Sequence, residues 1–428
     1  MSVEKLKILF IVPGAGDPFY CGNCFRDNLQ ANALRNAGHD VIIMPLYLPL
    51  KDHSFLADTP LFFPATSLYL SQKYFRNKSM PRWMERILNS EISLNMAASF
   101  SGTTSAEGLE DMTLSMINGD DRVFLRQVRN LIQWMKKYEK PDVIHLSSNL
   151  IIGIAKAIKQ EIDVPIVCSL QDEEVWINGL QKKDAEAAWQ GIERNIVYID
   201  RFVTTSQFYK QGIIQRFPNI NIDVVYPGVD TSKYASEQYP QDPVIGFFYR
   251  MSEINGLDIL VDAFVKLKQE NRVSNLKLRI GGGYTSADKK FLKKVYRALS
   301  PYSKDVHWCD TYNLNDHATF YKEITAICVP LTFDESVGLY ICEAFAAGRP
   351  AIEPATGSFP EIVGDAGVLY SPNNSNSLAD AIEKLLTTEG LWQQTHINAL
   401  NLSQSRYNET QQAAKLYDTY KILINKKF

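Results

Sequence analysis

Residues 334–350 read DESVGLYICEAFAAGRP, and this stretch decides how the C-terminal part of the chain folds. It follows the apolar run AICVPL at 326–331, which is typical of a buried strand. Good helix formers come after Gly338, and Gly348 and Pro350 then form a common helix stop signal. The sequence therefore predicts a strand, a loop and a helix in this order.

Two carboxylates flank the predicted helix start. Glu335 lies in the loop, and Glu343 lies inside the helix. The backbone amides between them belong to Val337, Gly338, Leu339 and Tyr340. The first amides of a helix lack partners within the helix and, together with the helix dipole, favour an anion. A phosphate-binding site between two carboxylates suits a nucleotide-linked sugar. The equally open alternative is a surface loop with two solvated glutamates.

Length and composition set the class of protein. The chain has 428 residues, which is too long for one ordinary core and predicts two or three domains. Hydrophobic residues make up 45% and charged residues 22%, as in globular proteins. The net charge of −3 and the pI near 6.1 argue against a nucleic-acid partner. No apolar run approaches about 18 residues and the N-terminus lacks a signal-peptide core, so we expect a cytoplasmic protein.

Apolar runs occur in two consecutive α/β series. The first begins with KILFIV at residues 7–12, which is typical of a strand buried on both faces of a parallel sheet. The second begins with VIGFFYR at 244–250, after a polar segment at 236–243. We therefore predict an α/β fold with two doubly wound, Rossmann-like domains that face a cleft. The predicted domains span residues 1–235 and 243–403, and a C-terminal helix follows at 404–428.

The loop after the first strand suggests two other kinds of site. Gly14 and Gly16 are not followed by a third glycine at the spacing of a dinucleotide fingerprint, so a nicotinamide cofactor is not expected. Cys21 and Cys24 have the spacing of a metal or redox pair, but a zinc site needs two further ligands and no second pair lies nearby. We expect no metal, and the role of the two cysteines stays open.

Residues 73–88 mix basic and aromatic side chains at roughly helical spacing. Such a segment can lie on an anionic membrane surface beside a lipid acceptor, which would place the protein peripherally on the inner face of the membrane. The alternative is an amphipathic helix that packs on its own domain with its basic residues in water.

With its motifs assembled, the chain resembles a family-4 glycosyltransferase of the GT-B fold over nearly its whole length. Glu335 and Glu343 match the paired-glutamate motif of that family. Further matching stretches are residues 343–350, 357–361, 280–283 and 226–230. Residues 20–28 and 38–41 resemble a less characterised branch of the family.

The resemblance implies a retaining transfer of a sugar from a nucleotide-diphosphate donor, which would bind mainly to the C-terminal domain. Glu343 would accept hydrogen bonds from the ribose, and Glu335 would hold sugar hydroxyls near the anomeric carbon. The amides of residues 337–340 would meet a phosphate, and Arg250 would neutralise the leaving diphosphate without a metal. Glu361 is expected to order its own loop. The final helix would cross back to the N-terminal, acceptor-side domain.

Two positions depart from the family pattern. Asn255 stands where the family has a lysine that binds the diphosphate, and a neutral amide cannot neutralise a phosphate. Gln171 stands near the place of a histidine beside the donor sugar. The remaining candidates on the acceptor or phosphate side are Gly22, Asn23 and Arg26 at a helix start, where the alternative is a capped helix with solvated charge.

Three hypotheses follow for the function. The first is a glycosyltransferase whose acceptor is a glycan, a lipid or a small molecule. The second is a catalytically impaired GT-B protein that binds a nucleotide or sugar as a partner or regulatory subunit, which Asn255 and Gln171 would explain. The third is a phosphorylase or a nucleotide-sugar epimerase on the same fold, although the paired glutamates favour a transferase over an epimerase.

Overall fold

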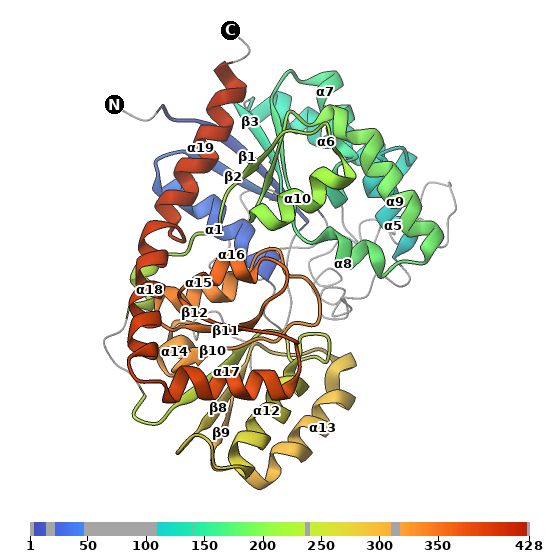
Figure 1. The fold of residues 1–428 in the computed structure, drawn as a ribbon. Helices are drawn as coiled ribbons and strands as arrows, with labels where there is room; N and C mark the ends of the chain where they lie inside the picture. Colours follow the sequence, from blue (N-terminus) through green and yellow to red (C-terminus); the bar gives the residue numbers. More distant parts are fainter. Residues whose placement is uncertain are drawn as a thin grey trace.

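The computed structural model describes residues 4–13, 22–46, 109–138, 140–235, 240–309 and 317–425. Two six-stranded sheets divide the described chain into an N-terminal and a C-terminal half, and every strand pair in both sheets is parallel. Figure 1 shows the two halves, with helices on both faces of each sheet. The predicted pair of doubly wound units is confirmed.

The N-terminal sheet has the strand order β2-β1-β3-β4-β5-β6. Its strands are β1 (Lys7–Val12), β2 (Asp40–Pro45), β3 (Val143–Leu146), β4 (Ile166–Ser169), β5 (Arg201–Thr204) and β6 (Ile222–Val224). Its helices are α1 (Gly22–Asn36), α5 (Glu110–Asn118), α6 (Arg122–Tyr138), α7 (Ile154–Glu161), α8 (Glu173–Asn178), α9 (Lys182–Asn195) and α10 (Gln207–Arg216), with the short 3-10 turns η1 (Asn149–Ile151) and η2 (Ile196–Tyr198). The continuous apolar strands are buried because helices cover both faces.

The C-terminal sheet has the strand order β12-β11-β10-β7-β8-β9. Its strands are β7 (Val244–Phe248), β8 (Lys277–Gly281), β9 (Val306–Trp308), β10 (Ala326–Ile327), β11 (Ala351–Pro354) and β12 (Gly367–Tyr370). The remaining helices are α11 (Thr231–Tyr234), α12 (Leu257–Gln269), α13 (Lys289–Leu299), α14 (His317–Lys322), α15 (Leu339–Ala346), α16 (Phe359–Val363), α17 (Ser375–Thr387), α18 (Leu391–Ser405) and α19 (Glu409–Asn425), with the 3-10 turns η3 (Ser286–Asp288) and η4 (Ser300–Tyr302).

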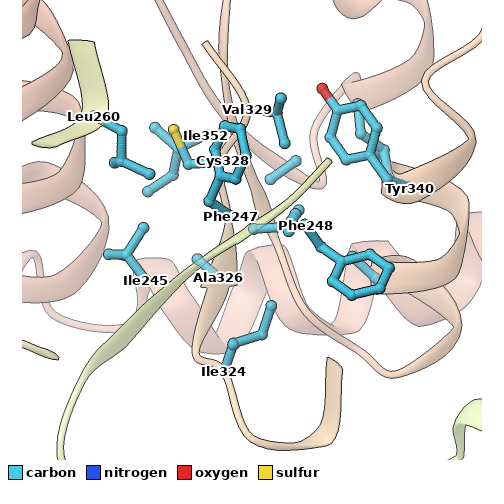
Figure 2. Close-up of a cluster of buried hydrophobic side chains, with 14 of the residues drawn as sticks. Ile245, Phe247, Phe248, Leu260, Ile324, Ala326, Cys328, Val329, Tyr340 and Ile352 are labelled. Carbon is cyan, nitrogen blue, oxygen red and sulfur yellow. The ribbon is translucent and has the colours of Figure 1, made fainter. Parts of the chain in front are cut away.

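A single apolar core fills the C-terminal half. Figure 2 shows Phe247 and Phe248 of β7 among buried side chains from neighbouring strands and from α15. All eight residues of α15 are buried, because this helix lies between the sheet and α18. Val229 and Tyr234 also belong to this core, although they precede the linker proposed at 236–243. The helix that carries Glu343 is therefore held rigidly from every side.

The C-terminal helix α19 returns to the N-terminal half, as predicted, and packs against α1 (Figure 1). Tyr420 hydrogen-bonds His145 of β3 at 2.6 Å between its hydroxyl and Nδ1, and Thr419 donates to Asp223 of β6 at 2.9 Å. His145 is thus a core histidine, and burial lowers its pKa to about 3. The expectation of a helix from residue 404 was wrong in its start, since α18 runs to Ser405 and α19 begins at Glu409.

Candidate functional site

The loop that carries Glu335 contacts the carboxyl end of β5 in the other half, where the Thr205 hydroxyl donates to the Ser336 carbonyl. Glu335 precedes α15 and is only 4% exposed. Its Oε1 accepts hydrogen bonds from the amides of Val337 at 3.0 Å and Gly338 at 3.3 Å, and the Tyr249 hydroxyl donates to Oε2 at 3.4 Å. Burial raises the pKa of Glu335, although these hydrogen bonds oppose the effect. Two of the amides predicted to meet a phosphate are therefore bound to Glu335 itself.

The segment before α16 supports the backbone of Glu335. The Ser358 amide donates to the Glu335 carbonyl at 2.8 Å. Gly357 has a φ of +59°, and a Cβ on it would lie 2.7 Å from the Glu335 amide nitrogen. Glycine is required there for conformation and for space, so the loop that matched the family motif at 357–361 holds the Glu335 loop in place.

Glu343 is completely buried, and among the described residues Tyr234, Tyr321 and His317 contact its carboxylate. The hydroxyl of Tyr234 donates to Oε1 at 2.7 Å and that of Tyr321 donates to Oε2 at 3.0 Å. His317 Nδ1 lies 3.0 Å from Oε1. A ribose hydroxyl would have to replace one of these contacts or join them, so the predicted ribose contact stays a prediction.

Arg250 follows β7 and forms a bidentate ion pair with Asp288. Its Nε donates to Oδ2 at 3.0 Å and its Nη2 donates to Oδ1 at 3.1 Å, while Thr285 accepts a further bond from Nη2 at 3.2 Å. Thr285 in turn donates to Asp288 through its amide at 2.8 Å and its hydroxyl at 2.7 Å. The arginine predicted to neutralise a diphosphate is therefore already matched by a carboxylate.

Asn255 stabilises the loop around Arg250. Its Nδ2 donates to the Arg250 carbonyl at 2.8 Å, and the side chain is buried. Gly256 follows with a φ of +73°, and a Cβ there would lie 1.9 Å from the Pro330 carbonyl oxygen. The loop thus passes directly against the end of the β10 segment, which brings Arg250 to the same sheet edge as Glu335.

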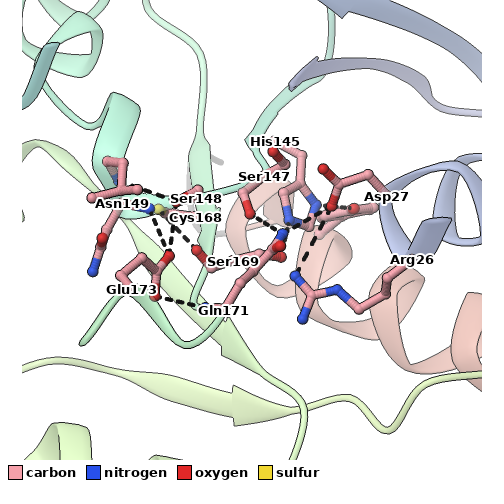
Figure 3. A network of polar contacts seen from close by, with 12 residues as sticks. Arg26, Asp27, His145, Ser147, Ser148, Asn149, Cys168, Ser169, Gln171 and Glu173 are labelled. Atoms are coloured by element: carbon pink, nitrogen blue, oxygen red, sulfur yellow. Dashed lines mark hydrogen bonds and ion pairs between the residues drawn. The ribbon is translucent and has the colours of Figure 1, made fainter. Parts of the chain in front are cut away.

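Gln171 points into the N-terminal half, where it joins a buried polar network (Figure 3). Its Nε2 donates to Asp27 Oδ1 at 2.8 Å and also to the Ser147 carbonyl. The main-chain amide of Gln171 donates to the Glu173 carboxylate at 2.7 Å. The same carboxylate accepts from the Ser148 hydroxyl at 2.9 Å. The sequence does not indicate this network, whose members come from the ends of β3 and β4 and from α1.

Arg26 lies on α1 next to this network and is 0% exposed. Its Nη2 is 4.0 Å from Asp27 Oδ1, and no guanidinium nitrogen has a hydrogen-bond partner among the residues that the structure describes. Burial raises the pKa of Asp27 to about 6, while Arg26 opposes the shift. Gly22 starts the same helix. Outside the part that the structure describes lie Cys21, the segment 73–88, and the side chains of Asn23 and Cys24.

Asp172 is a further candidate for the site, which the sequence prediction did not include. It is half-buried at the start of α8, and its φ of 56° is rare outside glycine. Its pKa is raised well above the usual value by burial and then by the charge of Glu335 in the other half. Thr205 donates to the Ser336 carbonyl at 2.9 Å beside them. Only the acidic run at 172–174 could have drawn attention to it.

The structure therefore groups the predicted residues in two clusters. Glu335, its amides and the Arg250 loop belong to the C-terminal half, and Gln171 with Arg26 belongs to the N-terminal half. Thr205 of the N-terminal half joins the two halves beside Glu335, because its hydroxyl donates to the Ser336 carbonyl at 2.9 Å. Among the described ranges, no group of three or more His, Cys, Asp or Glu side chains is arranged to hold a metal ion. In the same ranges no helix is both long and apolar enough to cross a membrane.

Two facing, parallel, six-stranded α/β units with a final helix that crosses back define the GT-B fold. Comparison with protein families gives one match in each half. The family described as "Glycosyltransferase Family 4" matches residues 112–233, and "Glycosyl transferases group 1" matches residues 242–388. The chain belongs to this glycosyltransferase group 1/family 4.

Curated relatives of the chain are distant. The D-inositol 3-phosphate glycosyltransferase of Corynebacterium aurimucosum is 28% identical over 192 residues, which cover 39% of this chain and 43% of that protein. A glycosyltransferase of Methanocaldococcus jannaschii is 23% identical over 305 residues, 67% of this chain and 76% of that protein. The matched region thus spans less than half of the inositol-phosphate enzyme.

Solved structures resemble the chain over nearly all of its length. Sucrose-phosphate synthase from Thermosynechococcus elongatus has a TM-score of 0.69 and 16% identity, with 98% of this chain and 100% of that chain covered. Anabaena HepE in complex with UDP and glucose has a TM-score of 0.66 and 16% identity, with 97% and 99% covered. At this identity the likeness establishes the fold alone.

Proposed function

We propose that the protein is a retaining glycosyltransferase that moves a sugar from a nucleotide-diphosphate donor to an acceptor. The observation that carries the proposal is the buried carboxyl of Glu335, which precedes α15, accepts a hydrogen bond from Tyr249 and adjoins the contact between Thr205 of the other half and the Ser336 carbonyl. The names of the relatives support the reaction class, and the HepE structure, which holds UDP and glucose, supports the donor class.

The chemistry explains why these residue types would be needed. Cleavage of a glycosyl–phosphate bond develops positive charge on the sugar and negative charge on the leaving diphosphate. Glu335 would stabilise the sugar, and Arg250 with the amides of residues 337–340 would stabilise the diphosphate. Positioned donors and a guanidinium can supply this stabilisation without a metal ion.

Donor binding would require an exchange of hydrogen bonds at this site. The amides of Val337 and Gly338 are bound to Glu335, and Arg250 is bound to Asp288. A diphosphate has several acceptor oxygens, so it can take over such donors while Glu335 turns toward sugar hydroxyls. Hydrogen bonds at catalytic sites commonly rearrange when the substrate binds.

The same contacts favour a second candidate, a GT-B protein that binds a nucleotide or sugar without transferring it. Two side chains are expected at the diphosphate. Arg250 forms an ion pair with Asp288, and the neutral side-chain amide of Asn255 donates to the Arg250 carbonyl. Weaker stabilisation of the leaving group would slow the chemistry more than it weakens ground-state binding.

The acceptor is proposed to be a glycan, a lipid or a small molecule that binds on the N-terminal half. Peripheral membrane contact through residues 73–88 would suit a lipid acceptor and remains a proposal. Sedimentation of the full chain with vesicles that contain anionic phospholipid tests it, and recovery of the protein in the supernatant would contradict it.

A panel of nucleotide sugars tests the reaction. Release of nucleoside diphosphate is measured for the wild type, for Glu335→Gln and for the matched control Glu389→Gln, whose side chain is exposed in the turn between α17 and α18. We expect turnover with at least one donor, a loss of about 100-fold or more in Glu335→Gln, and wild-type activity in the control. Nucleotide binding without turnover for every donor would refute the transferase and favour the second candidate.

A further inference from the structure

Glu361 of α16 binds the first turn of α10 in the opposite half. One carboxylate oxygen accepts the Gln207 amide at 2.8 Å, and the other accepts the Phe208 amide at 3.0 Å. The Tyr226 hydroxyl donates to the same carboxylate at 2.6 Å. All three donors precede the C-terminal sheet, so the expectation that Glu361 orders its own loop was wrong.

The Glu361 carboxylate accepts hydrogen bonds from two main-chain amides at the start of α10. The first amides of a helix have no partners within the helix, and the positive end of the helix dipole favours a carboxylate. Ser206 caps the Tyr209 amide at 3.2 Å, which leaves the two preceding amides for Glu361. Capping of α10 is therefore shared between its own half and the other half of the molecule.

This junction adjoins the Glu335 loop from both sides. In the N-terminal half, Thr205 lies immediately before the cap of α10 and donates to the Ser336 carbonyl. In the C-terminal half, Ser358 lies immediately before α16 and donates to the Glu335 carbonyl. A displacement of α10 from Glu361 would thus change where Glu335 lies relative to Asp172.

We propose that Glu361 is a positioning residue that holds the two halves together so that the acceptor side faces Glu335. The proposal rests on the proposed transferase function for its catalytic consequence only. The Glu361 carboxylate binds Gln207, Phe208 and Tyr226, so it acts through the placement of α10 and of the loop at 335–336. Its carboxylate is half-buried, and a neutral amide of similar shape would provide one acceptor instead of two charged ones.

The test compares Glu361→Gln with the control Asp365→Asn, whose exposed carboxyl lies just beyond α16. Small-angle X-ray scattering of the full chain measures the separation of the halves without any substrate. We expect a larger radius of gyration for Glu361→Gln, unchanged scattering for the control, and a smaller increase for Tyr226→Phe, which removes only one of the three bonds. Equal scattering from Glu361→Gln and the wild type would overturn the proposal.

Kinetics provide the second measurement once a donor is found. We expect kcat of Glu361→Gln to fall by about tenfold, while its Kd for the nucleoside diphosphate stays at the wild-type value, because the donor would be held by the C-terminal half. A loss confined to nucleotide affinity, with kcat unchanged, would contradict a positioning role. If the wild type turns over no donor, the transferase proposal fails and scattering alone decides on Glu361.

Discussion

Replacement of Glu343 by glutamine tests whether this residue maintains the core, binds the donor, or does both. Glu343 is a buried carboxylate that three side chains contact at 2.7 to 3.0 Å. A carboxylate can accept all three hydrogen bonds, whereas glutamine offers one acceptor oxygen and an amide nitrogen that would face a hydroxyl or the imidazole. The substitution keeps the shape of the side chain and changes only its hydrogen bonding and charge.

The expected loss of stability follows from these contacts. A hydrogen bond to a charged group contributes about 1.5–3 kcal/mol, and a buried polar group left without a partner costs about 1–3 kcal/mol. Rotation of the Tyr234 or Tyr321 hydroxyl can recover part of this, so we expect the free energy of unfolding to fall by about 2–4 kcal/mol. Denaturant unfolding measures it, and Tyr321→Phe, which removes one donor, should lose less.

Binding separates the two roles of Glu343. If it contacts the ribose, the wild type should bind a nucleoside diphosphate more tightly than its 2′-deoxy or 3′-deoxy analogues, and Glu343→Gln should reduce that preference. Isothermal titration calorimetry provides the affinities. A change in stability below about 0.5 kcal/mol would refute the reasoning from the buried contacts. Equal affinity of the wild type for ribose and both deoxyribose forms would refute the ribose contact.

Three further predictions concern charged and buried groups. Asp288→Asn should tighten the binding of nucleoside diphosphate by about tenfold at low salt, as calorimetry would show, because it removes a negative charge that competes for Arg250; weaker binding would mean that Asp288 orients the arginine instead. Tyr420→Phe should lower the free energy of unfolding by about 1–3 kcal/mol, since it leaves His145 Nδ1 buried without its partner, and an unchanged denaturation midpoint would contradict this. Burial raises the pKa of Asp27 to about 6, so the folded chain retains a proton that the unfolded chain has lost above its ordinary pKa of 3.8. Relative to Asp27→Asn, the free energy of unfolding of the wild type should therefore fall by up to about 3 kcal/mol as the pH rises from about 4 to about 6, and parallel pH profiles would contradict the assignment.

In the C-terminal half, the groups proposed to bind the nucleotide sugar are held by other groups of the chain. Arg250, Asn255 and the amides at the start of α15 each bind another group of the same chain. Such contacts fix the geometry of the loops, and a nucleotide sugar that binds there as proposed would have to replace some of them. Its affinity would then include the free-energy cost of breaking these hydrogen bonds, which substitutions at Asp288 and Glu335 would change.

The sequence by itself determined the elements and their order. Continuous apolar runs such as KILFIV at 7–12 can only be buried between two layers of helices, and two series of them predicted two doubly wound sheets. Gly338 and the helix formers after it predicted the start of α15 correctly, with Glu335 in the loop and Glu343 inside the helix. These features depend on local periodicity and on backbone preferences, which neighbouring residues encode.

Only the tertiary structure decided what each charged group contacts. Asp288 lies 38 residues from Arg250, and Gln207 lies 154 residues from Glu361. Asp172 had no recognisable role until the fold brought it near enough to Glu335 for the charge of Glu335 to raise its pKa further. Such pairs depend on how loops end and how two halves meet, and the hydrogen bonds of a side chain follow from its final position in space, which no short stretch of sequence specifies.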